Sequence, residues 1–216
     1  MSAHFVELLE HLHRRCVDMS ALVEAAVDQA ADALVNRDAA LAATVLENEA
    51  KIDAEEVEIE RASINLCARH QPAATDLRTV FAVVKINSDL ERIGDCAANI
   101  AQLVGPFAAA GSETPHDIRV LADSARQQVR DTTRCLAARD VAVAEQVCRN
   151  DDVVDALYHQ AYQDLQAGMV ANTGQVPADL ALIMAAKYFE RIGDHCTNIA
   201  EEIIYLVRGE IVRHVH

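Results

Sequence analysis

Two copies of one five-residue motif place acidic side chains one helical turn apart. Residues 91–95 read Glu-Arg-Ile-Gly-Asp, and residues 190–194 return the same letters. Residues four apart share one face of a helix, so the two carboxylates of each copy project side by side. Like charges at this spacing destabilise an isolated helix, and a glycine within a helix costs on the order of 1 kcal/mol relative to alanine. The recurrence of both costs indicates that the motif has a role.

A further acidic row precedes each motif copy. Glu49 and Asp53 lie four residues apart in the first half of the chain, and Asp151 and Asp155 do so in the second. If each half folds as an antiparallel bundle, each row can face the motif that follows it. Converging carboxylates repel one another unless they are protonated, paired with arginine or bound to a cation. Ligand sets made only of oxygen favour Mg²⁺, Mn²⁺ or Ca²⁺, and carboxylates also bind iron.

Pairing with arginine is the alternative to a bound cation. Arg92 and Arg191 each follow the glutamate of a motif copy and can neutralise it. In that case the protein is a helical scaffold without metal, and its acidic rows are ordinary solvated faces. The spacing and the duplication of the motif, taken together, leave both interpretations open.

An enzyme of the ferritin-like type, with a carboxylate-bridged pair of metal ions, is a further alternative. That class carries a Glu-x-x-His motif on each of two bundle helices. The chain offers one at residues 10–13, but the other, at residues 113–116, lies in a stretch rich in proline and glycine. No nucleophile motif, Walker loop or dinucleotide fingerprint occurs. We therefore predict no catalytic residue and no enzyme activity.

Histidine and cysteine near the motifs are not expected to be ligands. His195 follows Asp194, and adjacent residues lie about 100° apart around a helix, so His195 is expected to support the second site or to pack. The six cysteines are scattered singly, without a Cys-x-x-Cys pair. They are expected to be core residues of a protein in the reducing cytoplasm.

Composition and periodicity predict an all-α fold of six long helices. Of the 216 residues, 51% are hydrophobic and 4% aromatic, and only seven glycines and four prolines interrupt the chain. Between the breaks run helical segments of about 25 to 30 residues. One segment has an apolar residue at every seventh position, namely Val45, Ile52, Ile59 and Leu66. Asp38 and Asp140 stand where helix N-caps are expected, and Pro177 suits a first turn.

The chain repeats itself beyond the acidic motif. Residues 34–38 read Leu-x-x-Arg-Asp, and residues 136–140 return this pattern. The stretch 105–115 is the richest in helix breakers and is expected to be the linker between the copies. We predict two tandem, internally duplicated three-helix bundles, at residues 1–107 and 108–216.

The formal net charge of −15 limits the partners. An acidic surface repels nucleic-acid phosphates and anionic lipid headgroups, so no nucleic acid is expected to bind. No run of some 20 apolar residues occurs, and the first residues lack a signal-peptide pattern, so no direct membrane insertion is expected.

Longer stretches of the chain resemble the PhoU family. Residues 71–78 read Gln-Pro-x-x-x-Asp-Leu-Arg, and residues 85–95 read Lys-Ile-Asn-Ser-Asp-Leu followed by the motif. Residues 190–199 continue the second motif copy as His-Cys-Thr-Asn-Ile. These stretches are similar to the two signatures of that family, in the same order.

The resemblance implies a fold and a set of ligands. Family members are two similar three-helix bundles in tandem, whose Glu/Asp-x-x-x-Asp motifs hold metal ions or clusters. The ligand role then falls on Glu49, Asp53, Glu91, Asp95, Asp151, Asp155, Glu190 and Asp194. The expected cofactors are divalent or trivalent ions: Mg, Mn, Fe or Zn. Asp151 stands in place of Glu49, and its shorter reach is expected to alter the second site.

The resemblance also implies a regulatory function. Such proteins are negative regulators of the phosphate-starvation response and of phosphate uptake. The expected partners are a sensor histidine kinase and the ATPase subunit of the phosphate-specific ABC transporter. A metal-binding adaptor of this kind is expected to be a cytoplasmic homodimer.

Overall fold

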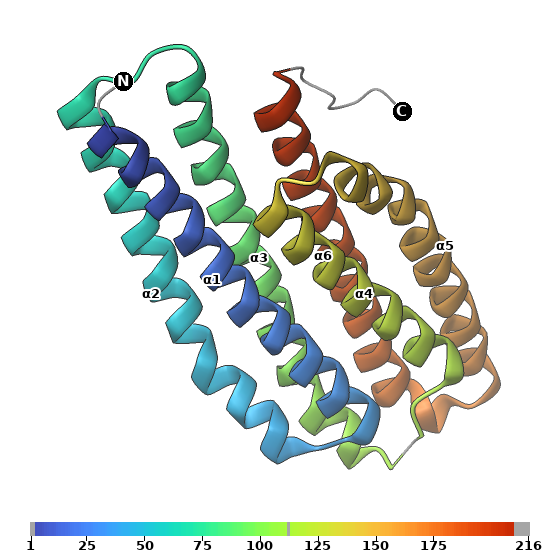
Figure 1. Cartoon of the computed structure of the whole chain (residues 1–216). Coiled ribbons are helices and arrows are strands. Elements are labelled where there is room, and N and C mark those ends of the chain that lie inside the picture. The colour runs from blue at the N-terminus through green and yellow to red at the C-terminus, as the bar shows by residue number, and fades with distance from the viewer. Residues whose placement is uncertain (1–2, 112, 210–216) are drawn as a thin grey trace.

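A computed structural model describes residues 3–111 and 113–209. This part of the chain forms six α-helices and no strand (Figure 1). The helices are α1 (Ala3–Asn36), α2 (Ala39–His70), α3 (Thr75–Ala109), α4 (His116–Ala138), α5 (Val141–Ala171) and α6 (Val176–Arg208), with the short 3₁₀ helix η1 (Thr173–Gln175) before α6. The predicted all-α fold of two tandem three-helix bundles is confirmed.

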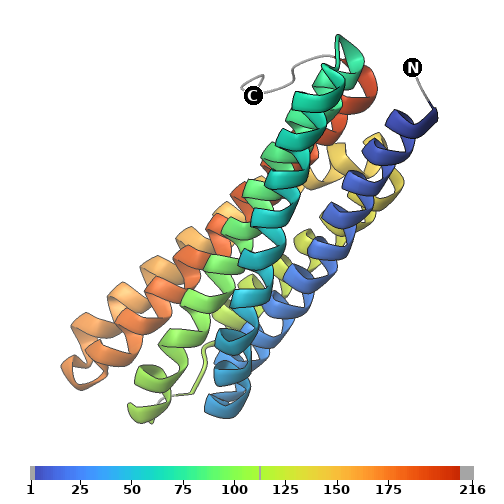
Figure 2. The ribbon, with the colours of Figure 1, turned by 90° about the vertical axis from the view of Figure 1, so that its left-hand side faces the viewer.

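The two bundles lie side by side. Within the described residues, α2 packs only on α1 and α3, and α5 packs on α4, α6 and η1. The bundles meet where α1 packs on α4 and α3 packs on α6. Helices α2 and α5 therefore form the outer edges, and α1 begins at the end of the elongated molecule where α6 stops (Figures 1 and 2).

The seven-residue apolar repeat of α2 faces the core, as its periodicity predicts. Its four residues, Val45, Ile52, Ile59 and Leu66, are each at most 5% exposed. The buried apolar side chains of both bundles join in one continuous cluster. Burial on this scale stabilises helices that propensity alone would leave marginal.

Aspartate side chains start the second helix of each bundle. The Asp38 carboxylate accepts hydrogen bonds from the backbone N–H groups of Ala40 and Leu41, each 3.0 Å long. Asp140 does the same for Ala142 and Val143. The predicted caps are thus confirmed, and each satisfies N–H groups that have no partner within the helix.

The linker is shorter than the sequence predicts. Helix α3 continues through Gly105 and Pro106 to Ala109, so the expectation that the linker starts at residue 105 is wrong. The proline has no N–H to donate to the carbonyl of Gln102, but both residues are exposed. Phe107, fully buried, holds the last turn against the core. The domain boundary between residues 107 and 108 falls in this turn and stays a prediction.

Polar side chains join α3 to α6 across the bundle interface. Asp89 Oδ1 lies 2.9 Å from His195 Nδ1 and accepts a hydrogen bond of 3.2 Å from Asn198 Nδ2. Farther along, Lys85 Nζ lies 3.3 Å from Glu202 Oε1. His195 thus packs between the bundles, one of its two expected roles.

Candidate metal centres

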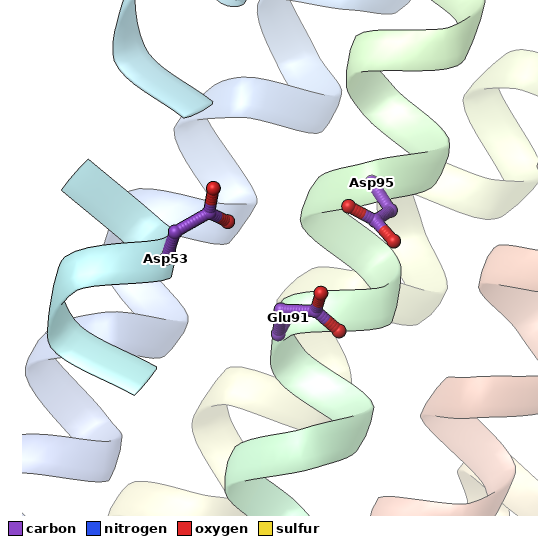
Figure 3. A group of neighbouring side chains, drawn as sticks. All are labelled: Asp53, Glu91 and Asp95. Atoms are coloured by element: carbon purple, nitrogen blue, oxygen red, sulfur yellow. The ribbon is translucent and has the colours of Figure 1, made fainter. Parts of the chain in front are cut away.

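Three carboxylates of the first bundle converge between α2 and α3. Asp53, Glu91 and Asp95 each offer an oxygen atom, and these atoms all lie within 4.8 Å of one another. Asp53 reaches from α2 toward the consecutive turns of α3 that carry the other two (Figure 3). We call these residues the first trio.

The second bundle repeats this arrangement between α5 and α6. Asp155, Glu190 and Asp194 also bring one oxygen each within 4.8 Å of the others. We call them the second trio. These trios are the groups of at least three potential ligands at such distances within the described residues.

The remaining two predicted ligands stand beside the trios and not within them. Glu49 is half-buried, and its pKa is raised by burial and by the charges of Asp53 and Asp95. Asp151 accepts a hydrogen bond of 3.4 Å from Gln128 Nε2. Burial, with the charges of Asp194 and Asp155, raises the pKa of Asp151 to about 6. Each carboxylate therefore adds negative charge beside its trio, but it is not one of the three that converge there.

The motif glycines set the distance between the helices. A Cβ atom on Gly94 would lie 3.1 Å from Ile52 Cδ1, and one on Gly193 would lie 3.2 Å from Asp151 Oδ1 and 3.3 Å from Val154 Cγ1. Real Cβ contacts are seldom this short. Glycine at these two positions lets the paired helices approach closely beside each trio.

Basic side chains contact both trios, but not in the same way. In the first, Arg92 lies 3.4 Å from Glu91 and 3.1 Å from Asp95. In the second, Lys187 Nζ lies 2.6 Å from Glu190 Oε1. This contact was not predicted from the sequence, although the spacing of three residues could have indicated it. No ion pair joins Arg191 to a described carboxylate, so the alternative of pairing with arginine has support at Arg92 and none at Arg191.

These cations leave uncompensated charge at both centres. Burial, followed by the charge of Asp95, raises the pKa of Glu91. Burial, followed by the charges of Glu190 and Asp155, raises the pKa of Asp194. Moreover, Glu190 Oε2 is buried and accepts no hydrogen bond from the described residues. A buried carboxylate oxygen without a partner is costly, and a bound cation would remove that cost.

The donor set therefore fits a metal ion. Carboxylate oxygens suit hard cations such as Mg²⁺ and Mn²⁺, and iron also binds carboxylates. The first trio would hold one centre and the second trio the other. A bound cation would supply positive charge that lets the paired helices approach without repulsion.

The family model described as the PhoU domain matches this chain twice, over residues 16–104 and 118–203. The chain belongs to the PhoU family. Each match contains one trio complete.

Individual PhoU proteins agree with this over their full lengths. A phosphate-specific transport system accessory protein PhoU homolog from Burkholderia sp is 37% identical, covering 100% of this chain and 93% of that protein. The homolog from Aquifex aeolicus is 37% identical over 96% of this chain and 95% of its own. The crystal structure of PhoU from Pseudomonas aeruginosa superposes with a TM-score of 0.92 at 34% identity, covering 95% of this chain and all of that one.

No helix in the described residues combines the length and apolar character needed to cross a bilayer.

Proposed function

We propose that this protein is an accessory regulator of phosphate-specific transport that represses the phosphate-starvation response when phosphate is plentiful. The observation that carries the proposal is the pair of equivalent carboxylate trios within two PhoU domains. The full-length relatives with 34–37% identity, named as accessory proteins of the phosphate-specific transport system, support the same role.

The finer mechanism is that of a cytoplasmic adaptor. It binds the ATPase subunit of the phosphate transporter and the cytoplasmic region of a sensor histidine kinase, and it forms a homodimer. The net charge of −15 supports contact with basic surfaces on such partners. The proposed role contains no catalytic step, in keeping with the relatives' names as accessory proteins.

The bound metal gives the adaptor its shape. Each trio draws one outer helix, α2 or α5, against its neighbour, and a cation there neutralises the carboxylates. The metal therefore stabilises the arrangement of the faces that partners recognise. The ion is Mg, Mn, Fe or Zn.

A scaffold without metal is the second candidate. It is favoured by one observation, the contacts of Arg92 with Glu91 and Asp95 in the first trio. In the second trio Lys187 contacts only one of the three carboxylates in this way, which weakens this candidate there.

A gene deletion tests the regulatory role. Expression of a phosphate-starvation reporter is measured in phosphate-rich medium in the wild type, the deletion strain and strains complemented with variants of each trio. Constitutive expression in the deletion strain, restored by the intact gene, is the expected result. A reporter that stays repressed in the deletion strain would overturn the proposal. Complementation by variants lacking both trios would favour the scaffold without metal.

A further inference from the structure

A cavity of about 210 Å³ lies where the start of α4, the end of α5 and the start of α6 meet. Its lining includes the carboxylates of Asp117, Asp164 and Asp179, and none of its lining residues is basic. It lies far from the metal centres, because Asp179 precedes Asp194 by fifteen residues of α6, or about 22 Å at 1.5 Å per residue.

Asp179 is the unusual group in this cavity. The residue is only 8% exposed, and its carboxylate takes part in no hydrogen bond or ion pair with any described residue. Burial raises its pKa. The adjacent N-terminus of α6 favours a negative charge, and the carboxylate oxygens are not fully buried, so a ligand in the cavity can reach them. Its oxygen Oδ2 would lie 3.5 Å from a Cβ atom on Gly168, which also lines the cavity.

The other two carboxylates are less constrained. Asp117 is half-buried in the first turn of α4, and exposed Asp164 accepts a hydrogen bond of 2.7 Å from Gln160. The oxygen atoms of Asp117, Asp164 and Asp179 do not meet within the 4.8 Å that marks the two trios. The cavity therefore does not suit a single metal ion. It suits a longer organic cation, whose charged and apolar parts can contact different walls of the cavity.

Apolar side chains complete the cavity wall. Ile118, Ala161 and Leu165 line it and belong to the buried core. Such a wall binds methylene groups, while the carboxylates bind a charged end. A cavity with an apolar wall and a few polar groups at fixed positions is typical of small-ligand sites.

We propose that this cavity binds an alkyl chain that carries an ammonium or guanidinium group, with the cationic head against Asp179 and the methylene groups against Ile118 and Leu165. Two sources can supply this chemistry: a free diamine of the polyamine class, or a lysine or arginine side chain of a protein partner. An N–H donor from either source gives Asp179 the charged hydrogen bond that it lacks.

The first bundle shows that this acidic lining is not a general property of the repeat. Its corresponding cavity lies between α1 and α2 and is lined by Ala62 and Leu66, the residues 102 positions before Asp164 and Gly168. That cavity carries the basic side chain of Arg69 and no carboxylate. Of these two cavities, the one in the second bundle has the acidic lining.

Calorimetric titration of the whole protein tests the proposal. Agmatine, which has an ammonium and a guanidinium group joined by methylenes, is titrated at physiological ionic strength, and N-acetyl-arginine methylamide is titrated separately. Asp179→Asn is expected to weaken binding of at least one probe by roughly tenfold or more, the worth of a charged hydrogen bond. Asp-Leu occurs at residues 76–77, near the start of α3, and again at residues 179–180, near the start of α6. The matched control is therefore Asp76→Asn, since Asp76 is half-buried and does not line the cavity.

A second variant keeps the charge and removes the space. Gly168→Leu fills the cavity from α5 and is expected to abolish binding while Asp179 remains. Thermal melting checks that each variant is folded. Binding of agmatine alone indicates a free diamine, and binding of the capped arginine indicates a partner side chain. Failure of both probes to bind, or equal weakening by Asp179→Asn and Asp76→Asn, would overturn the proposal.

Discussion

Gly94 of α3 lies directly against Ile52 of α2, so close that a Cβ atom at residue 94 would be 3.1 Å from Ile52 Cδ1. Ile52 is 2% exposed and precedes Asp53, the residue of α2 that belongs to the first trio. The close approach of these two residues therefore fixes the separation across which the trio forms. The glycine belongs to the site although it has no ligand atom.

Gly94→Ala is expected to leave the protein less stable than the helix propensity of alanine alone would make it. Alanine gains about 1 kcal/mol in a helix, but overpacking against Ile52 costs roughly 1 to 3 kcal/mol. The control is Gly168→Ala in α5, because a Cβ atom there would meet Asp179 Oδ2 at an ordinary 3.5 Å. Urea denaturation should show Gly168→Ala stabilised by roughly 0.5 to 1 kcal/mol and Gly94→Ala less stable than it by at least about 1 kcal/mol. Equal stabilisation would show that the close contact is not restrictive.

Arg92→Gln is expected to tighten metal binding at the first trio. Arg92 contacts Glu91 and Asp95 and so competes with a cation for them. Its contacts are partly exposed, so the gain should be roughly twofold to fivefold, or up to about 1 kcal/mol. The measurement is competition for Mn²⁺ against a chelating indicator, in protein whose second trio carries Glu190→Gln and Asp194→Asn. Arg191→Gln is the control and should change nothing at the first trio. Weaker Mn²⁺ binding by Arg92→Gln would contradict the claim that Arg92 competes with the metal for these carboxylates.

The second bundle of metal-free protein should become more stable as pH falls from about 7 toward 4. The pKa of Asp151 is about 6 in the folded protein, above its ordinary value of 3.8, so the folded state takes up the proton first. Its ionised form therefore destabilises the fold above pH 6, and protonation removes this cost. One pKa unit is worth about 1.4 kcal/mol, and solvent screening at this half-buried site reduces the total to about 1 to 2 kcal/mol.

Asp151→Asn isolates this effect. In the presence of a chelator it should raise the free energy of unfolding at pH 7.5 by about 1 to 2 kcal/mol, and the gain should shrink below pH 5. Asp152→Asn, at the exposed neighbouring position, is the control. Destabilisation by Asp151→Asn at pH 7.5 would mean that the hydrogen bonds of Asp151 outweigh its burial and its acidic neighbours.

The helices could be predicted from sequence because their signals are local. Asp38 and Asp140 mark helix starts by their own side chains, and the seven-residue repeat of α2 marks its buried face. The end of α3 could not be predicted in this way. Pro106 indicates a break, but burial of Phe107 in tertiary contacts carries the helix onward.

The candidate site was predictable in part for the same reason. Spacing of four residues identifies both members of each acidic row, but it does not tell which member reaches the facing helix. That choice depends on where α2 crosses α3, and the structure brings Asp53 into the first trio and leaves Glu49 beside it. The cavity around Asp179 joins three helix ends distant in sequence, so no local pattern could have indicated it.

The central claim is that both trios hold metal, and elemental analysis tests it most directly. The protein is purified without an affinity tag or added metal, alongside Glu91→Gln with Asp95→Asn, Glu190→Gln with Asp194→Asn, and all four changes together. The wild type is expected to contain metal. Each double variant should lose the metal of one bundle, and the quadruple variant should lose the metal of both. Full metal content in the quadruple variant would contradict the ligand assignment. A wild type that retains no metal, and whose unfolding is the same with chelator and with added Mn²⁺, would contradict the claim itself.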